Sequence, residues 1–379
     1  MSTKISGNGI YSWWTQPLAV KRGSDTFFTA VTLEGYWRVF RNDSTDYVQL
    51  GTGNQDDHNV PCVVAEAGKD IIVFYTQHGV TSTVKYKKCS TWPTFGSEQT
   101  ITFPYGTTYV NTITDPVNDT IYLFTRSSEQ KWYVTKSTDW GDTWSTPILF
   151  FESSVTNARM YCLIQPSESE SGAFHLAATG HPSDDWKTIR YGKIDIFNGE
   201  ITSNEAYVAN LDGTDLPLNE YSLEKAWEPS GTQRTRLLDI GDKDNKPYLL
   251  YARWDDSTTV PGYYNGVRNN STNTWNQSYM MSSGGVFGPV EARKYVGGAC
   301  IDRNGNNWIY LMRKLSSSYR IEKYTLDSSL QPDVGSTVVS ESSNWVVRPV
   351  AVRGEDRVHW CKLINYNDFD DYQSHIYKD

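Results

Sequence analysis

Seven times along this chain, a short apolar run is followed by a polar turn and a second apolar run. The copies span residues 16–33, 59–77, 109–126, 158–180, 233–254, 297–314 and 347–364. Turn clusters such as "AGKD", "DPVND" and "DRNGNN" separate the two runs of a copy. Val, Ile, Tyr, Phe and Trp are frequent in the runs, which is typical of β-strands. No long stretch has the apolar spacing of an amphipathic helix, so the pattern predicts an all-β protein.

Consecutive copies begin roughly 45 to 75 residues apart, which leaves room for four strands and their loops. Repeats of this length that each form a small sheet are typical of β-propellers. We therefore predict a single domain, residues 1–379, folded as a seven-bladed β-propeller with four-stranded antiparallel blades around a central channel. We also expect a strand from one terminus to complete the blade that begins at the other terminus.

The amino-acid composition restricts the partners of such a domain. Aromatic residues make up 14% of the chain, with 14 Trp and 25 Tyr; these residues pack well in sheets, and exposed ones often stack on sugar rings. The net charge of −9 argues against a nucleic-acid partner, because nucleic-acid binders usually carry a basic excess. A local cluster of cations can still attract an anionic substrate. The five cysteines are scattered without a CxxC pair, which argues against a disulfide framework and a zinc knuckle.

The chain shows no segment typical of a signal peptide, and no apolar run approaches the roughly 20 residues of a membrane span. We therefore expect a soluble protein without a membrane partner that is intracellular, virion-borne, released by lysis or expressed without its leader. We expect no required cofactor and no catalytic metal. A structural calcium ion is compatible with a propeller, but no motif here assigns one, and the oligomeric state is left open.

One motif supports the propeller independently of the repeat. The segment "STDWGDTW", Ser137 to Trp144, matches the Asp-box pattern S-x-D-x-G-x-T-W at every position. In such a box a tight turn links the two outer strands of a blade, the Asp accepts hydrogen bonds from the loop backbone, and the Trp packs beneath. The motif is structural and lies away from catalysis.

The order of strands predicts which side chains meet. In a propeller the first strand of each blade is innermost and the second runs antiparallel to it, so the start of the first and the end of the second share one face. His58 and His78 hold these two places in the second copy, and Tyr109 and Arg126 hold them in the third. The same rule adds Arg159, Tyr161 and His181 in the fourth copy, Arg234, Arg236 and Arg253 in the fifth, Arg313 in the sixth and Arg348 in the seventh.

A face rich in His, Tyr and Arg suits β-elimination at a uronic acid. The C5 proton of a uronate becomes removable only when the neighbouring carboxylate is neutralised or hydrogen-bonded, which an Arg or His can do. A base then takes this proton and an acid protonates the leaving O4. Histidine titrates near neutrality and can take either role, and tyrosine can act as the acid, or as the base where cations lower its pKa. No metal is required when an arginine neutralises the carboxylate.

Two other functions are compatible with parts of the pattern. A glycoside hydrolase generally needs two facing carboxyl groups; Asp56 and Asp57 precede His58, but no second acidic residue holds a matching place, and a sialidase would also need a Glu partner for its Tyr. A carbohydrate-binding propeller without activity would repeat one sugar site in every blade. Here the His, Tyr and Arg residues concentrate in copies two to four, which favours catalysis.

The sequence resembles the BNR-repeat propellers that include the ulvan lyases, a family of seven-bladed polysaccharide lyases. The resemblance extends over nearly the whole chain, through the segments "YSWWTQPLAV", "DDHNVPCVV", "VFYTQHG", "YLFTR", "STDWGDTWS", "RMYCLI", "TGHP", "YVGGACID", "RPVAVRG" and "VHWCKLINYNDFDDYQ" in that order. It implies that His58 and Tyr109 form the acid/base pair and that His78 and Arg126 hold and neutralise the uronate carboxylate. Which of His58 and Tyr109 is the base stays open. Neighbouring subsites would then be lined by Arg159, Tyr161 and His181.

Two features depart from this family. Secreted bacterial members carry a leader, and a chain without one also suits a phage-borne depolymerase. Residues 205–232 match little of the family pattern, and we expect them to form a long loop over the channel mouth that governs substrate choice. The predicted partner is therefore an anionic polysaccharide, ulvan-like or a bacterial exopolysaccharide, that the protein meets outside the cell.

Overall fold

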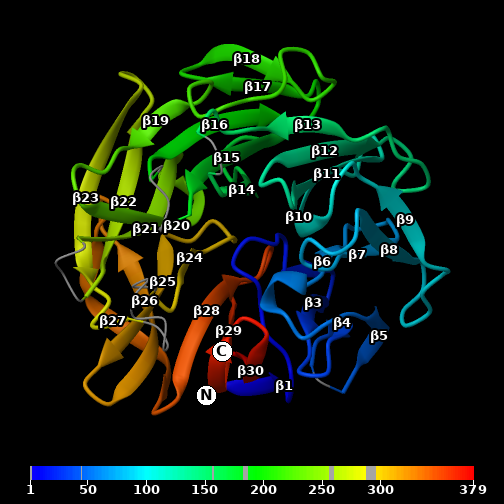
Figure 1. The fold of residues 1–379 in the computed structure, drawn as a ribbon. Coiled ribbons are helices and arrows are strands. Elements are labelled where there is room, and N and C mark those ends of the chain that lie inside the picture. Colours follow the sequence, from blue (N-terminus) through cyan, green and yellow to red (C-terminus); the bar gives the residue numbers. More distant parts are fainter. Residues whose placement is uncertain (1, 44, 156–157, 182–186, 256–259, 287–295) are drawn as a thin grey trace.

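The computed structural model describes residues 2–43, 45–155, 158–181, 187–255, 260–286 and 296–379. These residues form seven antiparallel sheets arranged in a ring (Figure 1), which confirms the all-β, seven-bladed propeller. Pro182 and Tyr295, which end and begin two of the segments that resemble the lyases, lie outside the described residues. Within the described part of the chain, no helix is long and apolar enough to cross a membrane.

The first three blades follow one another along the chain, each from its innermost to its outermost strand. Blade one contains β2 (Ala19–Arg22), β3 (Asp25–Val31), β4 (Tyr36–Arg41) and β5 (Tyr47–Thr52). Blade two contains β6 (Cys62–Val64), β7 (Ile71–Tyr75), β8 (Thr83–Cys89) and β9 (Gln99–Thr102), preceded by the short 3₁₀ turn η1 (Asp57–Asn59). Blade three contains β10 (Thr107–Asp115), β11 (Thr120–Ser127), β12 (Trp132–Ser137) and β13 (Ile148–Phe151).

The remaining blades include one enlarged and one closing sheet. Blade four contains β14 (Met160–Pro166), β15 (Ala173–Gly180), β16 (Ile189–Asp195), β17 (Glu200–Ser203), β18 (Ala206–Asn210) and β19 (Glu224–Trp227). Blade five contains β20 (Gln233–Lys243), β21 (Lys246–Asp255), β22 (Gly262–Asn269) and β23 (Thr274–Ser282). Blade six contains β24 (Ala299–Ile301), β25 (Trp308–Leu315), β26 (Ser318–Leu326) and β27 (Pro332–Ser342). Blade seven contains β28 (Trp345–Ala351), β29 (Val358–Asp368), β30 (Asp371–Lys378) and β1 (Thr3–Ser6).

The two inner strands of a blade are largely apolar and buried because both of their faces are covered by neighbouring blades. All five residues of β7 are buried, and so are all eight residues of β11 and of β15. The outer strands alternate instead; β5, for example, exposes Tyr47 and buries Leu50. The continuous apolar runs in the sequence are therefore the second strands of the blades.

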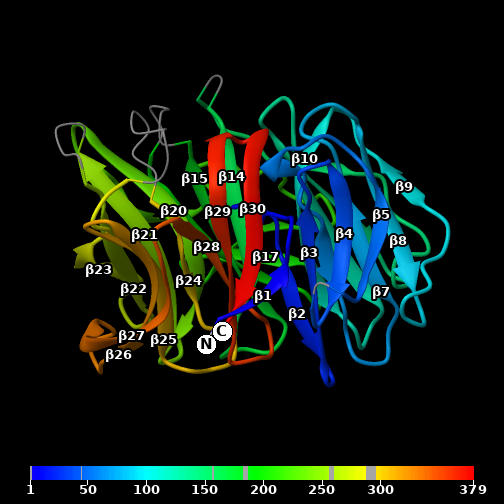
Figure 2. The ribbon, with the colours of Figure 1, turned by 90° about the horizontal axis from the view of Figure 1, so that it is seen from below.

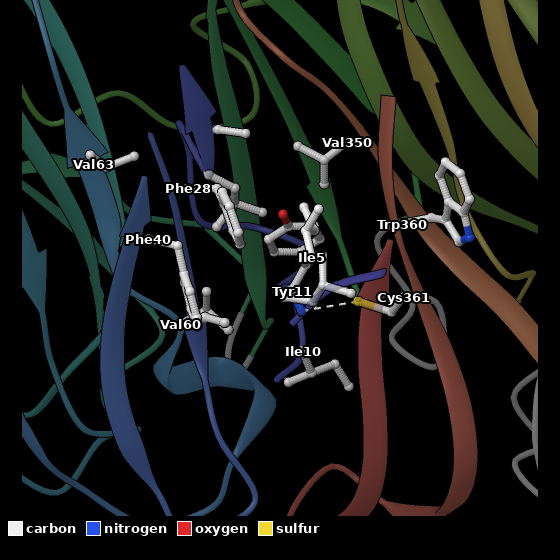
Figure 3. Packing of buried hydrophobic residues seen from close by; sticks show 14 of the residues in the cluster. Ile5, Ile10, Tyr11, Phe28, Phe40, Val60, Val63, Val350, Trp360 and Cys361 are labelled. Atoms are coloured by element: carbon white, nitrogen blue, oxygen red, sulfur yellow. Dashed lines mark hydrogen bonds between the residues drawn. The ribbon is translucent and has the colours of Figure 1, made fainter. Parts of the chain in front are cut away.

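The ring is closed by its N-terminal strand, as the sequence predicts. Strand β1 pairs antiparallel with β30, with Thr3 opposite Lys378, and the two termini lie close together (Figure 2). Figure 3 shows the apolar cluster at this junction, where Ile5, Ile10 and Tyr11 pack near Trp360 and Cys361. The Tyr11 backbone N–H also points to the Cys361 Sγ at 3.3 Å.

The segment after β1 enters the middle of the ring, where the central channel of the propeller is expected. Gln16 forms a parallel bridge with Asn111 of β10, and the Asn111 side-chain amide donates to the Trp14 carbonyl at 2.8 Å. The Trp13 ring has Arg236 on it at 4.2 Å and Arg348 at 4.7 Å. A cavity of ≈ 40 Å³ lies beside this segment. The N-terminal segment thus fills much of the centre and underlies one face of the propeller.

The prediction that residues 205–232 form a loop over the channel mouth is wrong. This segment contains β18, which pairs with β17, and β19, which pairs with β16. Both strands lie on the outer side of blade four (Figure 1). The outer edge of β16 has room for two short partners, because β17 pairs with Lys193 and Ile194 while β19 pairs with residues 189–191.

The segment Ser137–Trp144 forms the turn between β12 and β13 that its sequence predicts. Asp139 accepts hydrogen bonds from Thr143 Oγ1 and from the backbone N–H groups of Asp142 and Thr143, and these bonds, that of the Thr143 side chain first, lower the pKa of Asp139 to about 2. The Trp144 ring packs edge-on against Phe74 of blade two. The turn therefore ties blade three to its neighbour.

Candidate active site

The candidate site lies on the face where the innermost strands begin and the second strands end, here called the upper face. The turn η1 places His58 just before β6, and His78 follows β7. Asp56 caps η1 and accepts the backbone N–H of His58 at 2.8 Å. The local fold therefore fixes the His58 backbone relative to the Asp56 carboxylate, and the backbone N–H of His78 donates to Asn59 Oδ1 of the same turn at 2.7 Å.

The two imidazole rings are stacked. Their centroids are 4.0 Å apart with an interplanar angle of 15°, as the strand order predicts for residues 58 and 78. Asp56 lies within hydrogen-bond distance of both Nδ1 atoms, at 2.6 Å from His58 and 2.9 Å from His78. When each Nδ1 donates to Asp56, each Nε2 is left to act on a ligand. Phe369, at the tip of the β29–β30 hairpin, packs edge-on against both rings.

A second carboxylate, that of Asp57, also contacts the His58 ring. Asp57 Oδ1 lies 3.1 Å from His58 Nδ1, and its Oδ2 accepts hydrogen bonds from Arg348 Nη2 and from the Tyr366 hydroxyl. The Arg348 side chain is 1% exposed and that of Asp57 is 4% exposed. This buried ion pair joins blade seven to η1 and holds Asp57 against the histidine.

The charges around His58 favour its protonated form. Burial alone would lower the pKa of His58, but hydrogen bonds to Asp56 and Asp57 raise it to about 9. Burial would likewise raise the pKa of Asp57, yet the Arg348 charge holds it well below its usual range. The pKa of Asp56 is lowered too, because the bonds from His58 and His78 outweigh its burial. His58 therefore carries a proton at neutral pH.

Tyr109 reaches the site because β10 bulges. The register between β10 and β11 shifts between Thr108 and Val110, and Tyr109, between them, has a φ of 55°. A positive φ is uncommon for a residue with a side chain, and such strained residues concentrate at functional sites. The phenol ring is 5.3 Å from the ring of His58. Burial raises the pKa of Tyr109 well above its usual value, and Arg126 acts in the opposite direction.

Arg126 lies between two tyrosine rings. Its guanidinium carbon is 4.9 Å from the centroid of Tyr109 and 4.8 Å from that of Tyr161, and the residue is 4% exposed. Its buried Nε and Nη1 atoms meet no hydrogen-bond acceptor among the described residues. Leaving a buried cation without an anion is costly, and each such group in a native structure requires an explanation.

Blade four adds further predicted residues beside Arg126. The Tyr161 ring packs on Trp14 at 4.6 Å and lies 6.0 Å from the ring of His181. His181 donates its backbone N–H to the Arg159 carbonyl, which places Arg159 at the same end of the blade. The structure thus brings His58, His78, Tyr109 and Arg126 together with Tyr161 and His181; their roles in catalysis stay predictions.

The other predicted arginines do not share one environment. Arg348 is buried in its ion pair with Asp57, so the prediction that it lines the substrate-binding rim is wrong. Arg313 Nη1 bonds to Glu322 Oε2 at 3.2 Å and to the Tyr324 hydroxyl, so it is paired within blade six. Arg236 is 4% exposed and packs on Trp13 in the centre. The upper ends of β20 and β21 carry the last two, Arg234 and Arg253.

Three contributors to the site were not predicted in these roles. Asp56 was seen only as an available carboxylate, although its place two residues before His58 suits a cap of η1. Trp14 and Phe369 reach the site from opposite ends of the chain. Neither has a local signal, because each arrives through a segment that packs on the face from elsewhere in the fold.

One group at the site has the composition of a metal site. Asp56, His58 and His78 present ligand atoms that all lie within 4.8 Å of one another. The Nδ1 atoms of both histidines, however, lie at 2.6 and 2.9 Å from the Asp56 oxygens. Those are distances of N–H donors to a carboxylate, so the group fits two histidines oriented by one acceptor.

Comparison with known proteins identifies similar folds. No protein-family model and no curated protein sequence matches the chain. An ulvan lyase of polysaccharide lyase family PL25, solved bound to -[GlcA(1-4)Rha3S]-, matches with a TM-score of 0.75 at 13% identity, over 99% of this chain and 95% of its own. The chain has the fold of that ulvan lyase.

Two further solved structures share the propeller more distantly. The polysaccharide lyase Uly1 matches with a TM-score of 0.57 at 9% identity, over 97% of this chain and 89% of its own. The BP39L lectin from Burkholderia pseudomallei matches with a TM-score of 0.55 at 12% identity, over 100% of this chain and 96% of its own. Lyases and a lectin thus share this fold, and the function has to be argued from the site.

Proposed function

We propose that the protein is a polysaccharide lyase that cleaves a uronic-acid-containing anionic polysaccharide by β-elimination. The observation that carries this proposal is Arg126, a buried residue whose Nε and Nη1 atoms meet no acceptor among the described residues, close to two imidazoles and a phenol. A uronate carboxylate bound there would supply the missing anion. Because Arg126 provides the positive charge, the proposed reaction uses no metal ion.

The elimination needs two proton transfers, and the site offers the groups for both. A base takes the C5 proton, the C4–C5 double bond forms as the C4–O4 bond breaks, and an acid protonates the departing O4. We assign these transfers to His58 and Tyr109, whose rings are 5.3 Å apart. The member of the pair that acts as the base must first lose its own proton, which for His58 becomes easier as the pH rises toward its pKa of about 9. His78 and Arg126 bind the carboxylate and stabilise the charge that develops on it. The product carries an unsaturated uronate at its new non-reducing end.

The carboxylates of the site argue against a glycoside hydrolase. Retaining and inverting glycosidases use two carboxyl groups that face the sugar from both sides. Both oxygens of Asp56 lie against histidines, and Asp57 is buried against Arg348 and Tyr366. Neither is placed as a free acid or nucleophile.

Similar proteins suggest the sugar. The ulvan lyase with the same fold was solved with glucuronic acid linked to 3-sulfated rhamnose, and we propose a polymer of this class as the substrate. Such polymers are extracellular, so we place the action of the protein outside the cell, as a secreted, lysis-released or phage-borne depolymerase.

The test is a panel of acidic polysaccharides followed by ultraviolet absorbance. Ulvan, glucuronan, alginate, pectate and bacterial exopolysaccharides are each mixed with the protein, and the absorbance of the unsaturated uronate should rise for at least one. New reducing ends without that absorbance would indicate hydrolysis instead. Binding without any cleavage would support the lectin alternative, which the lectin with the same fold makes a concrete one.

Two substitutions test the acid/base pair on whichever polymer is cleaved. His58→Ala and Tyr109→Phe should each lower the turnover number at least about 100-fold, since each removes a proton-transferring group. Circular dichroism and thermal unfolding serve as folding controls. Near-normal turnover in both variants would remove these residues from the mechanism.

A further inference from the structure

A second arginine on the upper face lies between two aromatic rings. The guanidinium carbon of Arg253, at the upper end of β21, is 4.9 Å from the ring centroid of Trp227 and 5.2 Å from that of Tyr264. The buried Tyr251 ring lies nearly parallel to both, at 6.0 Å from Trp227 and 5.7 Å from Tyr264. Arg253 thus lies between an aromatic ring of β19 in blade four and one of β22 in blade five.

Unlike several other arginines of this protein, Arg253 has no carboxylate partner within the described residues. Within the described residues its guanidinium forms neither an ion pair nor a hydrogen bond, and its contacts are the two rings. Carboxylates pair with the comparable arginines elsewhere in the ring, namely Arg268, Arg303, Arg313 and Arg348. Arg253 is partly exposed, so a ligand can approach it from solvent.

The aromatic groups around Arg253 are held in place. Trp227 donates its indole N–H to Thr235 Oγ1 at 3.1 Å. Tyr279, which is 55% exposed, packs on Tyr264 with the ring centroids 5.3 Å apart. A Cβ atom at Gly262 would come within 2.8 Å of the Tyr279 ring, so the absence of a side chain there allows the close packing. The result is a fixed aromatic surface around one cation.

Arg253 repeats the arrangement of Arg126 two blades away. Each lies near the upper end of the second strand of its blade, and each is flanked by two rings. They differ in burial, because Arg126 is 4% exposed while Arg253 is partly open to solvent. The first suits a sugar enclosed for chemistry, and the second suits a sugar held at the surface.

We infer that Arg253, Trp227 and Tyr264 form a second binding site, which takes the oxyanion of an acidic sugar at a distance from the bond that is cleaved. The guanidinium would bind the oxyanion through two parallel hydrogen bonds, and the flanking rings would pack on the sugar. The ligand follows from the proposed function, whereas the site itself involves no proton transfer. The oxyanion is a carboxylate or a sulfate ester, which share this binding geometry.

The experiment measures binding in a protein that cannot cleave. In the His58→Ala background, affinity electrophoresis compares gels that contain glucuronan, which carries carboxylates, with gels that contain dextran sulfate, and with ulvan, which carries both. Adding Arg253→Ala should weaken retention about 10-fold or more, because charge-assisted hydrogen bonds are lost. Arg320→Ala is the matched control, since Arg320 is a partly exposed arginine of blade six that already pairs with Glu341 at 2.9 Å.

The outcomes separate this site from the proposed activity. Retention of Arg253→Ala equal to that of Arg320→Ala in all three gels would overturn the site, whether or not the intact protein cleaves any polymer. A loss confined to glucuronan and ulvan would support the site and assign a carboxylate, and a loss confined to dextran sulfate and ulvan would assign a sulfate ester. A loss in all three gels would support a site that accepts either oxyanion. Arg253→Gln provides a second variant that keeps much of the side-chain volume.

Kinetics provide an independent readout if the protein is a lyase. With His58 restored, Arg253→Ala should raise KM for the long polymer several-fold and leave kcat unchanged, because the distant sugar is held equally before and during the reaction. For the shortest oligosaccharide that is cleaved, KM should not change. A fall in kcat on that short substrate would contradict a site remote from the chemistry.

Discussion

Two buried arginines border the candidate site, and they differ in what surrounds their charge. Arg126, on blade three, has a tyrosine ring on either side, and within the described part of the chain its Nε and Nη1 atoms have no acceptor. Arg348, on blade seven, bonds to the Asp57 carboxylate and to the Tyr11 carbonyl. From the order of the strands, both arginines were expected on the substrate-binding face.

This difference in surroundings suggests that Arg126 binds a ligand and that Arg348 stabilises the fold. A buried cation with its own carboxylate is compensated within the protein and has little to offer a ligand, and its charge serves instead to hold Asp57 in place. A buried cation that meets only aromatic faces is compensated when an anion arrives. Arg126 is therefore expected to matter for the reaction, and Arg348 for the stability of the fold.

Removing Arg348 should produce the largest change. Arg348→Met removes the buried guanidinium that pairs with Asp57 and leaves that carboxylate only its weaker charged contact with His58 at 3.1 Å, which should lower the free energy of unfolding by about 3–5 kcal/mol. Urea unfolding measures the loss, and the double variant Asp57→Asn/Arg348→Met should recover much of it, because no buried charge is left unpaired. A loss within about 0.5 kcal/mol, as for ordinary surface changes, would place Arg348 in the same class as Arg126.

Removing Arg126 should affect the reaction and spare the fold. Arg126→Ala should lower kcat/KM about 10²–10³-fold, since it deletes the group that stabilises the charge developing on the carboxylate. Its unfolding free energy should not fall as that of Arg348→Met does, because no carboxylate is left behind. Arg126→Lys keeps the charge and should retain part of the activity. Steady-state kinetics and urea unfolding are measured on the same samples. A loss of stability in Arg126→Ala together with a loss of activity alone in Arg348→Met would show that the two arginines have the opposite roles.

Asp56 tests whether the orientation of the histidines matters. Asp56→Asn replaces an acceptor that serves His58 and His78 with an amide whose N–H₂ group repels one of their Nδ1–H donors. Turnover should fall at least about 10-fold, part of the contribution of acid/base catalysis, with a changed pH profile. Asp142→Asn, an exposed residue that bonds Lys88, is the control for the chemical change. Equal turnover in both variants would show that Asp56 does not position the rings.

The pH dependence of stability is a smaller effect that tests whether the carboxylates beside His58 keep it protonated. The pKa of His58 is about 9 in the folded protein against an ordinary 6.5, so the folded state binds this proton more tightly. The resulting stabilisation is fully present below about pH 6.5 and is lost as the pH rises through about 9. The thermal midpoint should therefore fall by more between these pH values in the native protein than in His58→Gln. Parallel curves would mean that His58 is not held protonated.

How much of the site could be predicted differs between its parts. His58, His78, Tyr109 and Arg126 were placed together because each pair belongs to one blade, where chain direction alone determines which ends share a face. The partner of Asp57 could not be predicted in this way, because Arg348 is 291 residues distant. Tyr109 reaches the site through a bulge with a positive φ. No pattern of residues in the sequence predicts this bulge.

The strands, the seven repeats and the closure of the ring could be predicted from the residues alone, because apolar runs and polar turns act over a few residues. The sequence also predicted which face collects the imidazoles, the phenol and the guanidinium groups. The folded arrangement was needed to show which buried arginines pair with a carboxylate, where residues 205–232 lie, and that Trp13 and Trp14 fill the centre. These depend on neighbours brought from distant blades, and whether a buried charge is compensated is a property of its whole surroundings.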